Sequence, residues 1–109
     1  MIKDYIKSYE DWPVKGVSFK DISSLCNSDG FKLANDFLSS NLTKYTSESF
    51  TNKIIGIDAR GFIFASVFAD RTSLPLVLAR KEGKLPGDVE SKTYDLEYGE
   101  ATIEITKDS

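Results

Sequence analysis

Arginine and lysine side chains suited to binding an anion occur at two places in this chain. Arg60 follows Asp58 in the run DARGF, and Arg80, Lys81 and Lys84 lie in the run RKEGKLPGD. A guanidinium group binds two phosphate oxygens at once and lysine adds a point charge, so these runs suit a small molecule that carries phosphate. The alternative is structural: Asp58 caps a helix, Arg60 pairs with it at the surface, and the second run is a solvated loop.

Two further runs hold acidic or aromatic candidates. TYDLEYGE contains the carboxylates of Asp95, Glu97 and Glu100, which could act as general acids or bases or form a row of acids facing solvent. WPVKGVSFKD contains Phe19 within an irregular backbone. Phe19 could stack on a flat heterocycle while backbone amides recognise its edge, or it could fill the core beneath a loop.

Composition excludes several kinds of site. The chain has 109 residues, no histidine and one cysteine, Cys26, which removes Ser-His-Asp and Cys-His nucleophiles, histidine metal sites and an intrachain disulfide. A net charge of −3 argues against binding to nucleic-acid backbones. The most apolar window, residues 54–69, is too short to span a bilayer, and the N-terminus lacks the apolar core of a secretory signal. These features indicate a cytoplasmic protein that binds neither nucleic acid nor membrane.

Hydrophobic spacing predicts two helices in the first half of the chain. Apolar residues at helical intervals predict a short amphipathic helix over 1–11 and a longer helix over 29–45. Ser28 is expected to cap the longer helix. The segment 12–23, which contains proline and glycine, is expected to be irregular.

A strand–helix–strand unit follows, with a strand over 53–58, a helix over 61–71 and a second strand over 74–80. Such a unit joins parallel strands, and ligands bind at the carboxyl ends of those strands. The turn 58–61 and the cations Arg80 and Lys81 fall at these two ends. The pattern therefore predicts that they share a site.

The cationic loop leads into a predicted hairpin. Gly83 and Gly87 give the loop 81–92 the hinge freedom of a lid, although a plain solvated loop is the alternative. Apolar and polar side chains then alternate on both sides of Tyr98-Gly99-Glu100. This alternation predicts an antiparallel hairpin with one face toward solvent.

Taken together and in this order, the runs GVSFKDIS, GIDARGF, RKEGKLPG and YDLEYGE resemble the adenine phosphoribosyltransferases of purine salvage, from about Tyr9 to Ser109. GKLPG followed by LEYG is the most specific part, because phosphoribosyltransferases for other bases do not generally carry it. The resemblance implies a type I phosphoribosyltransferase fold of class α/β. This fold has a Rossmann-like parallel sheet with flanking helices, an N-terminal hood segment and an antiparallel hairpin that carries a flexible loop.

The resemblance also implies the reaction and the residues that bind the substrates. Adenine and 5-phosphoribosyl 1-diphosphate would give AMP and diphosphate, in a homodimer, with Mg²⁺ bound mainly through the diphosphate substrate. Adenine would be held by the backbone of Val17 and Lys20 and by stacking on Phe19. The diphosphate would be met by two groups of residues: the turn of Asp58, Ala59 and Arg60, and the cations Arg80, Lys81 and Lys84.

Two finer expectations come from the same resemblance. A non-proline cis peptide is expected between Ala59 and Arg60, where it would aim backbone groups at the ligand. Glu97 and Tyr98 correspond to the catalytic pair of the family. Glu97 could assist the proton balance of adenine and stabilise a cationic sugar.

The sequence departs from the family in two places. Lys15 stands where the hood usually has proline before its glycine. The family also continues past the position of Ser109 with paired acids and a Thr-Gly-rich turn, which grip the ribose hydroxyls and the 5′-phosphate. The sequence thus predicts one partial domain, with hood 9–23, strand–helix–strand unit 53–80, and loop and hairpin 81–107. Because the missing strand would pair in the same sheet, residues 1–109 alone are expected to expose an apolar edge and to be poorly soluble and inactive.

Two other hypotheses remain open at this point. The chain could be a non-catalytic relative that binds 5-phosphoribosyl 1-diphosphate as a regulator, or it could be an inactive fragment. Glu97 and the hood argue against the regulator, because a protein that only binds this ligand needs no catalytic carboxylate.

Overall fold

The computed structural model describes residues 2–48, 52–96 and 99–109. The chain divides into two compact units, Met1–Leu42 and Thr43–Ser109. No helix in the described ranges is long and apolar enough to cross a membrane.

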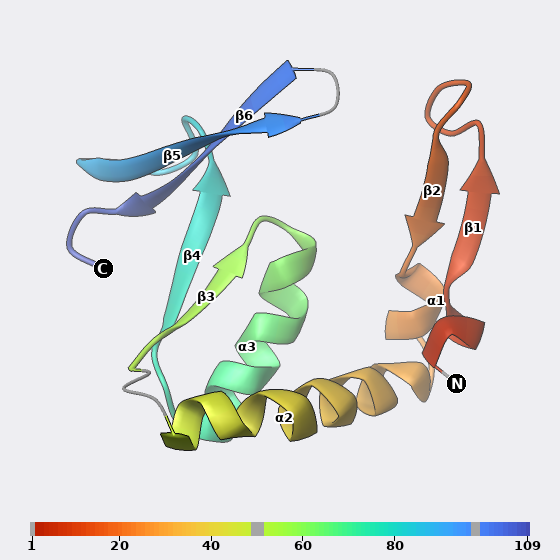
Figure 1. Ribbon diagram of the computed structural model, residues 1–109, viewed down its shortest axis with the longest axis horizontal. Helices are drawn as coiled ribbons and strands as arrows, with labels where there is room; N and C mark the ends of the chain where they lie inside the picture. Colours follow the sequence, from red (N-terminus) through yellow and green to blue (C-terminus); the bar gives the residue numbers. More distant parts are fainter. Residues whose placement is uncertain (1, 49–51, 97–98) are drawn as a thin grey trace. The chain divides into compact units, whose positions relative to one another are not determined.

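The first unit opens with the 3-10 helix η1 (Ile2–Tyr5) and a two-stranded antiparallel ribbon (Figure 1). The ribbon pairs β1 (Lys7–Glu10) with β2 (Ser18–Asp21). The helix expected over 1–11 is therefore wrong beyond η1, and the segment expected to be irregular contains a strand. Apolar spacing over so few residues fits helix and strand alike, and pairing with a later strand decides between them.

Two helices follow the ribbon: the short α1 (Ser23–Cys26) and the long α2 (Gly30–Glu48). α2 confirms the helix predicted over 29–45. The hydroxyl of Ser28 accepts a hydrogen bond from the backbone N–H of Gly30 at 3.2 Å, which confirms the predicted cap. The only buried polar residue among those described, Asn35, donates its side-chain amide to the carbonyl of Phe31 at 3.0 Å.

The second unit is a mixed sheet in the strand order β3-β4-β6-β5, with one helix, α3, between β3 and β4 (Figure 1). β3 and β4 are parallel, and β6 runs antiparallel to both β4 and β5. This arrangement confirms the strand–helix–strand unit and the hairpin. The bounds of these elements are β3 (Ile54–Ile57), α3 (Arg60–Thr72), β4 (Leu76–Lys81), β5 (Val89–Leu96) and β6 (Gly99–Thr106).

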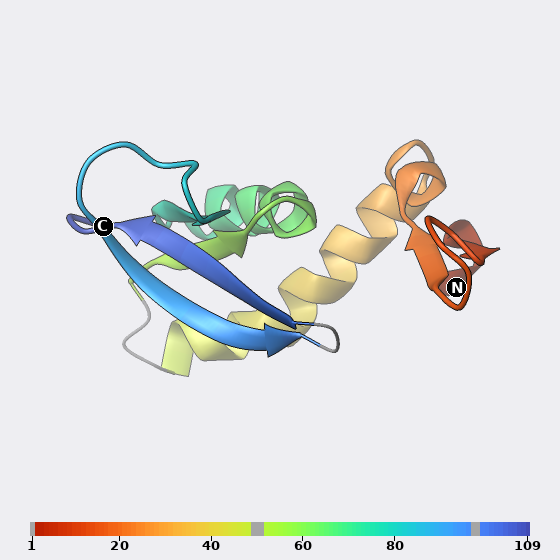
Figure 2. The same cartoon turned by 90° about the horizontal axis from the view of Figure 1, so that it is seen from above.

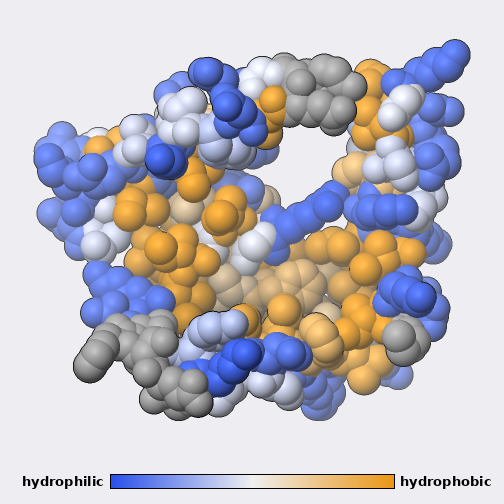
Figure 3. Space-filling model, in the orientation of Figure 1, coloured by the Kyte–Doolittle hydropathy of each residue, from blue (hydrophilic) through white to orange (hydrophobic). Residues whose placement is uncertain are grey.

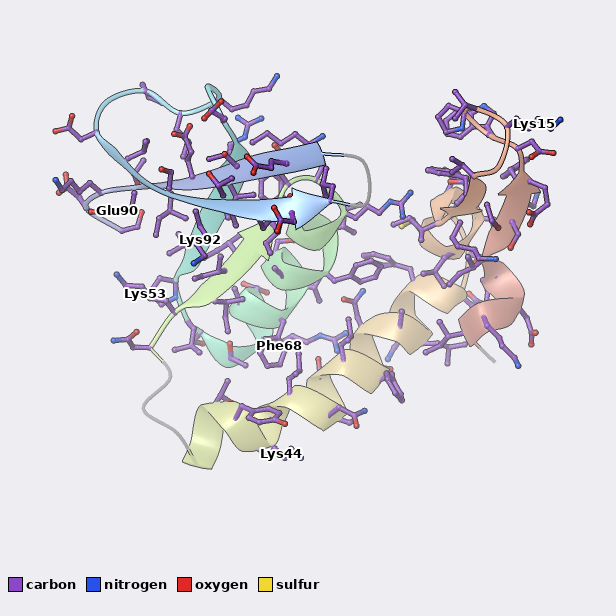
Figure 4. The ribbon with its side chains drawn as sticks, turned by 45° about the horizontal axis from the view of Figure 1, so that its top comes forward. Lys15, Lys44, Lys53, Phe68, Glu90 and Lys92 are labelled. Carbon is purple, nitrogen blue, oxygen red and sulfur yellow. The ribbon has the colours of Figure 1, made fainter. Side chains whose placement is uncertain are left out.

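Helix α3 packs closely on β3 because Gly56 has no side chain. A Cβ atom built on Gly56 would lie 2.9 Å from the Cβ of Ala65, closer than real carbon atoms approach. Phe68 on α3 is buried (Figure 4), as is Ala79 on β4. These residues form the core of the second unit and hold the strand ends in place.

The opposite face of β3 carries exposed hydrophobic side chains. Since Gly56 faces α3, its neighbours Ile55 and Ile57 face away from the helix. Their side chains are 57% and 51% exposed. Figure 3 shows hydrophobic side chains over this part of the sheet.

Candidate functional site

The carboxyl ends of β3 and β4 lie side by side, and the side chains that follow them meet there. A carboxylate oxygen of Asp58 lies 3.6 Å from Nε of Arg80. The same oxygen accepts a hydrogen bond from the backbone N–H of Lys81 at 3.4 Å. The N–H of Asp58 donates to the carbonyl of Ala79 at 2.9 Å. The shared position predicted for these two strand ends is confirmed.

Asp58 links the end of β3 to the end of β4 through its contacts with Arg80 and Lys81. Its side chain is only 11% exposed, whereas that of Arg80 is 36% exposed. Nε of Arg80 is buried, and 3.6 Å is too long for a hydrogen bond, so the pairing is electrostatic. The ion pair offsets the negative charge of Asp58.

A cis peptide joins Asp58 to Ala59 and turns the chain from β3 into α3. The cis bond expected one residue later, between Ala59 and Arg60, is wrong. α3 begins at Arg60, and the N–H of Phe62 donates to the carbonyl of Ala59 at 3.1 Å. The Ala59–Arg60 bond therefore belongs to the first helical turn, where peptide bonds are trans.

An open hollow of about 520 Å³ lies at this turn. Its lining brings together four of the predicted site residues, and the full set is Ile57, Asp58, Ala59, Arg60, Gly61 and Lys81. Arg60 and Lys81 are exposed cations, and the N-terminal end of α3, with its positive dipole end, lies at this turn. Since Asp58 is paired with Arg80, the hollow presents net positive charge and suits an anion.

The cationic loop between β4 and β5 appears as an arch in Figure 2. Gly83 and Gly87 have φ angles of 84° and 75°, in the left-handed region that favours glycine. The N–H of Lys84 donates to the carbonyl of Lys81 at 3.2 Å, so the backbone of Lys84 turns back toward the strand end. The side chain of Lys84 is exposed and does not line the hollow.

The first unit contains a second hollow, of about 380 Å³, on one face of the β1–β2 ribbon. Its lining residues are Tyr9, Trp12, Phe19 and Asp21. Tyr9 and Phe19 lie opposite each other in the two strands, and the rings of Trp12 and Phe19 are 4.6 Å apart at 60°. The predicted Phe19 thus belongs to an aromatic cluster. Sequence reasoning missed Tyr9, Trp12 and Asp21 as neighbours of Phe19, because only the strand pairing brings them together.

The loop that joins β1 to β2 is closed by its own hydrogen bonds. The carboxylate of Asp11 accepts from the N–H of Gly16 at 2.8 Å. Val17 donates its N–H to Val14 at 3.3 Å and accepts from Trp12 at 3.1 Å. Lys15 projects from the tip of this loop (Figure 4) and is exposed, so the loop forms without the family's proline.

The remaining predicted residues are divided between the described and undescribed parts of the chain. Lys20 lies on β2 opposite Ser8, and its ammonium group donates to the Ser8 hydroxyl at 2.7 Å. Asp95 and Glu100 lie opposite each other at the end of the hairpin. Glu97 and Tyr98 lie outside the described residues.

Sequence comparison finds closely similar proteins over nearly the whole chain, although no protein-family model matches it. The chain is 45% identical to the adenine phosphoribosyltransferase of Agathobacter rectalis, over 99% of its own length and 60% of the relative's. It is also 45% identical to the adenine phosphoribosyltransferase of Prochlorococcus marinus, over 99% of its own length and 61% of the relative's. The chain thus spans about 60% of the length of these curated relatives.

Structure comparison leads to the same kind of protein. The crystal structure of adenine phosphoribosyltransferase from Saccharomyces cerevisiae, complexed with an imino-altritol bisphosphate and adenine, matches with a TM-score of 0.87 at 30% identity. This match covers 99% of the chain and 62% of the yeast protein. The Giardia lamblia enzyme complexed with 9-deazaadenine matches with a TM-score of 0.81 at 36% identity, over 99% of the chain and 59% of that protein.

Proposed function

Because this chain corresponds in sequence and in fold to part of the adenine phosphoribosyltransferases, we propose that it serves the transfer of a phosphoribosyl group to adenine in purine salvage. Adenine and 5-phosphoribosyl 1-diphosphate would react to give AMP and diphosphate. The observation that carries the proposal is the cationic hollow at the adjoining ends of β3 and β4.

The diphosphate binds at this hollow. Arg60 presents a planar guanidinium at the start of α3, and Lys81 lines the same hollow. Arg80 is held beside it by Asp58. Lys84, whose side chain does not line the hollow, would reach the diphosphate when the loop moves. When the bond between ribose and diphosphate breaks, negative charge grows on the departing group. Cations that are already in place stabilise that charge without reorganising.

Adenine binds at the β1–β2 ribbon. Phe19 supplies a face for stacking. The edge of the base would be met by the backbone around Val17 and Lys20, where the Val17 carbonyl, which already accepts from Trp12, can accept a second hydrogen bond. The relatives from yeast and Giardia were crystallised with adenine and with 9-deazaadenine, which supports a base site in this fold.

Glu97 and Tyr98 are the proposed catalytic pair. A ring nitrogen of adenine forms a bond to the anomeric carbon of the ribose, the bond from that carbon to diphosphate breaks, and adenine loses a proton. The Glu97 carboxylate assists this loss of the proton and stabilises the positive charge that develops on the sugar.

Magnesium would be bound mainly through the diphosphate. No group of three Asp, Glu or Cys side chains in the described ranges lies close enough to hold a metal ion. Mg²⁺ prefers oxygen ligands and commonly binds phosphates with few protein groups. When bound, it would neutralise part of the charge on the leaving group.

We further propose that both units belong to one phosphoribosyltransferase domain. Its hood is 9–23, its strand–helix–strand unit is 53–80, and its catalytic loop and hairpin are 81–107. The protein would act as a cytoplasmic homodimer, as the family resemblance implies.

The test of this function is AMP formation by the full protein that carries this sequence. Purified protein is incubated with 5-phosphoribosyl 1-diphosphate, Mg²⁺ and adenine, hypoxanthine or guanine in turn, and nucleotides are separated by liquid chromatography. We expect AMP from adenine and no nucleotide from the other bases. Binding of 5-phosphoribosyl 1-diphosphate without nucleotide formation from any base would favour the non-catalytic alternative instead.

A further inference from the structure

We infer that Glu104, on β6, is a positioning residue for the cationic loop 82–88. Its carboxylate accepts a hydrogen bond from the backbone N–H of Gly83 at 2.8 Å. The N–H of Glu82 next to it donates to the carbonyl of Thr102, also on β6, at 3.1 Å. The first part of the loop is thus fixed to the neighbouring strand.

The far end of the loop is fixed as well. The N–H of Lys107 donates to the carbonyl of Asp88 at 3.0 Å. Lys84 directly follows Gly83, and its N–H donates to the carbonyl of Lys81 at 3.2 Å, so residues 85–87 lie between the two attachments. Gly83 is one of two glycines in the loop with a positive φ, here 84°, so Glu104 holds a residue with high backbone freedom. Glu104 therefore limits where the loop can carry the ammonium group of Lys84.

Glu104 also lies directly opposite Arg80 in the antiparallel pairing of β4 and β6. Residues opposite each other share a face of the sheet, so Arg80 has Asp58 on one side and Glu104 on the other. Glu104 is half-buried, whereas Lys81 and Lys84 are exposed. The carboxylate has two opposing effects on an anion bound nearby: it repels the anion by its charge, and it orders the loop that binds it.

We expect the ordering effect to be the larger one. Its hydrogen bond is short and made by a charged acceptor, which is the stronger kind. Repulsion across a solvated hollow is weakened by water and salt. This inference rests on the proposed function, because it assumes that the loop closes on diphosphate.

Two conservative variants separate the hydrogen bond from the charge. Glu104→Gln keeps a hydrogen-bond acceptor on a side chain of the same length and removes the negative charge. Glu104→Asp keeps the negative charge on a side chain that is one methylene shorter. Glu90→Ala is the matched control, since it removes an exposed carboxylate from β5 of the same sheet. Each variant of the full protein that carries this sequence is titrated with inorganic diphosphate by calorimetry, and amide hydrogen exchange at Gly83 is followed by NMR.

We expect Glu104→Asp to weaken diphosphate binding about three- to tenfold and to speed exchange at Gly83 about tenfold. Glu90→Ala should stay within about twofold of the unaltered chain in both measurements. Glu104→Gln, whose neutral acceptor makes a weaker hydrogen bond than the carboxylate, should lie between Glu90→Ala and Glu104→Asp. The inference would be overturned if Glu104→Gln changed diphosphate binding and exchange at Gly83 while Glu104→Asp changed neither.

The two readouts also distinguish this inference from the proposed function. If the unaltered chain binds no diphosphate, the proposed function fails at this site, and the role of Glu104 toward diphosphate fails with it. Exchange at Gly83 then still decides whether Glu104 holds the loop, because that measurement needs no ligand. Exchange at Gly83 that is the same in both Glu104 variants as in the unaltered chain would show that it does not.

Discussion

Arg60 is the residue on which the anion site depends most directly. It is the first residue of α3, it lines the hollow, and it adds a guanidinium at the positive end of the helix dipole. We expect Arg60→Ala to weaken the binding of inorganic diphosphate about tenfold to hundredfold, as measured by calorimetry. Arg71→Ala, in the last turn of the same helix, is the control and should leave affinity unchanged. Equal losses in both variants would mean that only net charge matters.

The sequence was sufficient to predict Asp58, Arg60 and Arg80 as neighbours, because parallel strands end at the same edge of a sheet. It was not sufficient for Trp12 or Glu104. Trp12 reaches Phe19 only through the path of a loop, and Glu104 reaches Gly83 only through the register of β6 against β4. Register and loop path depend on contacts far along the chain, which hydrophobic spacing does not report.

At the scale of elements, the contact between β3 and α3 sets the geometry of the site. Gly56→Ala would bring its Cβ to 2.9 Å from that of Ala65 and push the helix away from the strand. We expect a loss of about 1–3 kcal/mol in the free energy of unfolding, measured by urea denaturation. At Gly61 the nearest atom to such a Cβ is 3.6 Å away. Gly61→Ala should therefore be neutral or stabilising by up to about 1 kcal/mol. A neutral Gly56→Ala would contradict this close packing.

The β1–β2 ribbon contains a tryptophan whose fluorescence can report the binding of a base. Trp12 is the only tryptophan of the chain, and its ring lies 4.6 Å from that of Phe19. A base that stacks on Phe19 must change the surroundings of Trp12, so we expect adenine to change its fluorescence in a saturable way. Phe19→Leu should weaken adenine binding about twofold to tenfold, because an aromatic pair is lost. Tyr94→Leu, in the second unit, should not weaken it. A saturable change that Phe19→Leu leaves intact would place the base elsewhere.

The ribbon also shows where prediction from sequence fails at this scale. The longer elements, α2 and the strand–helix–strand unit, follow their hydrophobic spacing and were predicted to within a few residues. The segment 1–11 was predicted as a helix, but Lys7–Glu10 forms a strand. A segment of four residues is too short for its hydrophobic spacing to distinguish helix from strand, so pairing with the partner strand determines its structure.

At the scale of the molecule, the second unit combines a charged site with an exposed apolar face. Ile55 and Ile57 on β3 are each more than half exposed, at 57% and 51%, and lie on the face away from α3. β3 also lies at one edge of the sheet, whose strand order is β3-β4-β6-β5. Exposed apolar side chains on an edge strand favour association between copies of a chain.

We therefore expect the chain to self-associate at micromolar concentrations and the double substitution Ile55→Thr with Ile57→Thr to reduce this association. Threonine keeps the β-branched shape that suits a strand and removes apolar surface, so β3 itself should persist. Sedimentation velocity over a concentration series measures the effect. Ile63→Thr, on α3 and 39% exposed, is the control for a general loss of hydrophobicity. If the double variant associates as strongly as the original chain, the backbone edge of β3, rather than its side chains, holds the copies together.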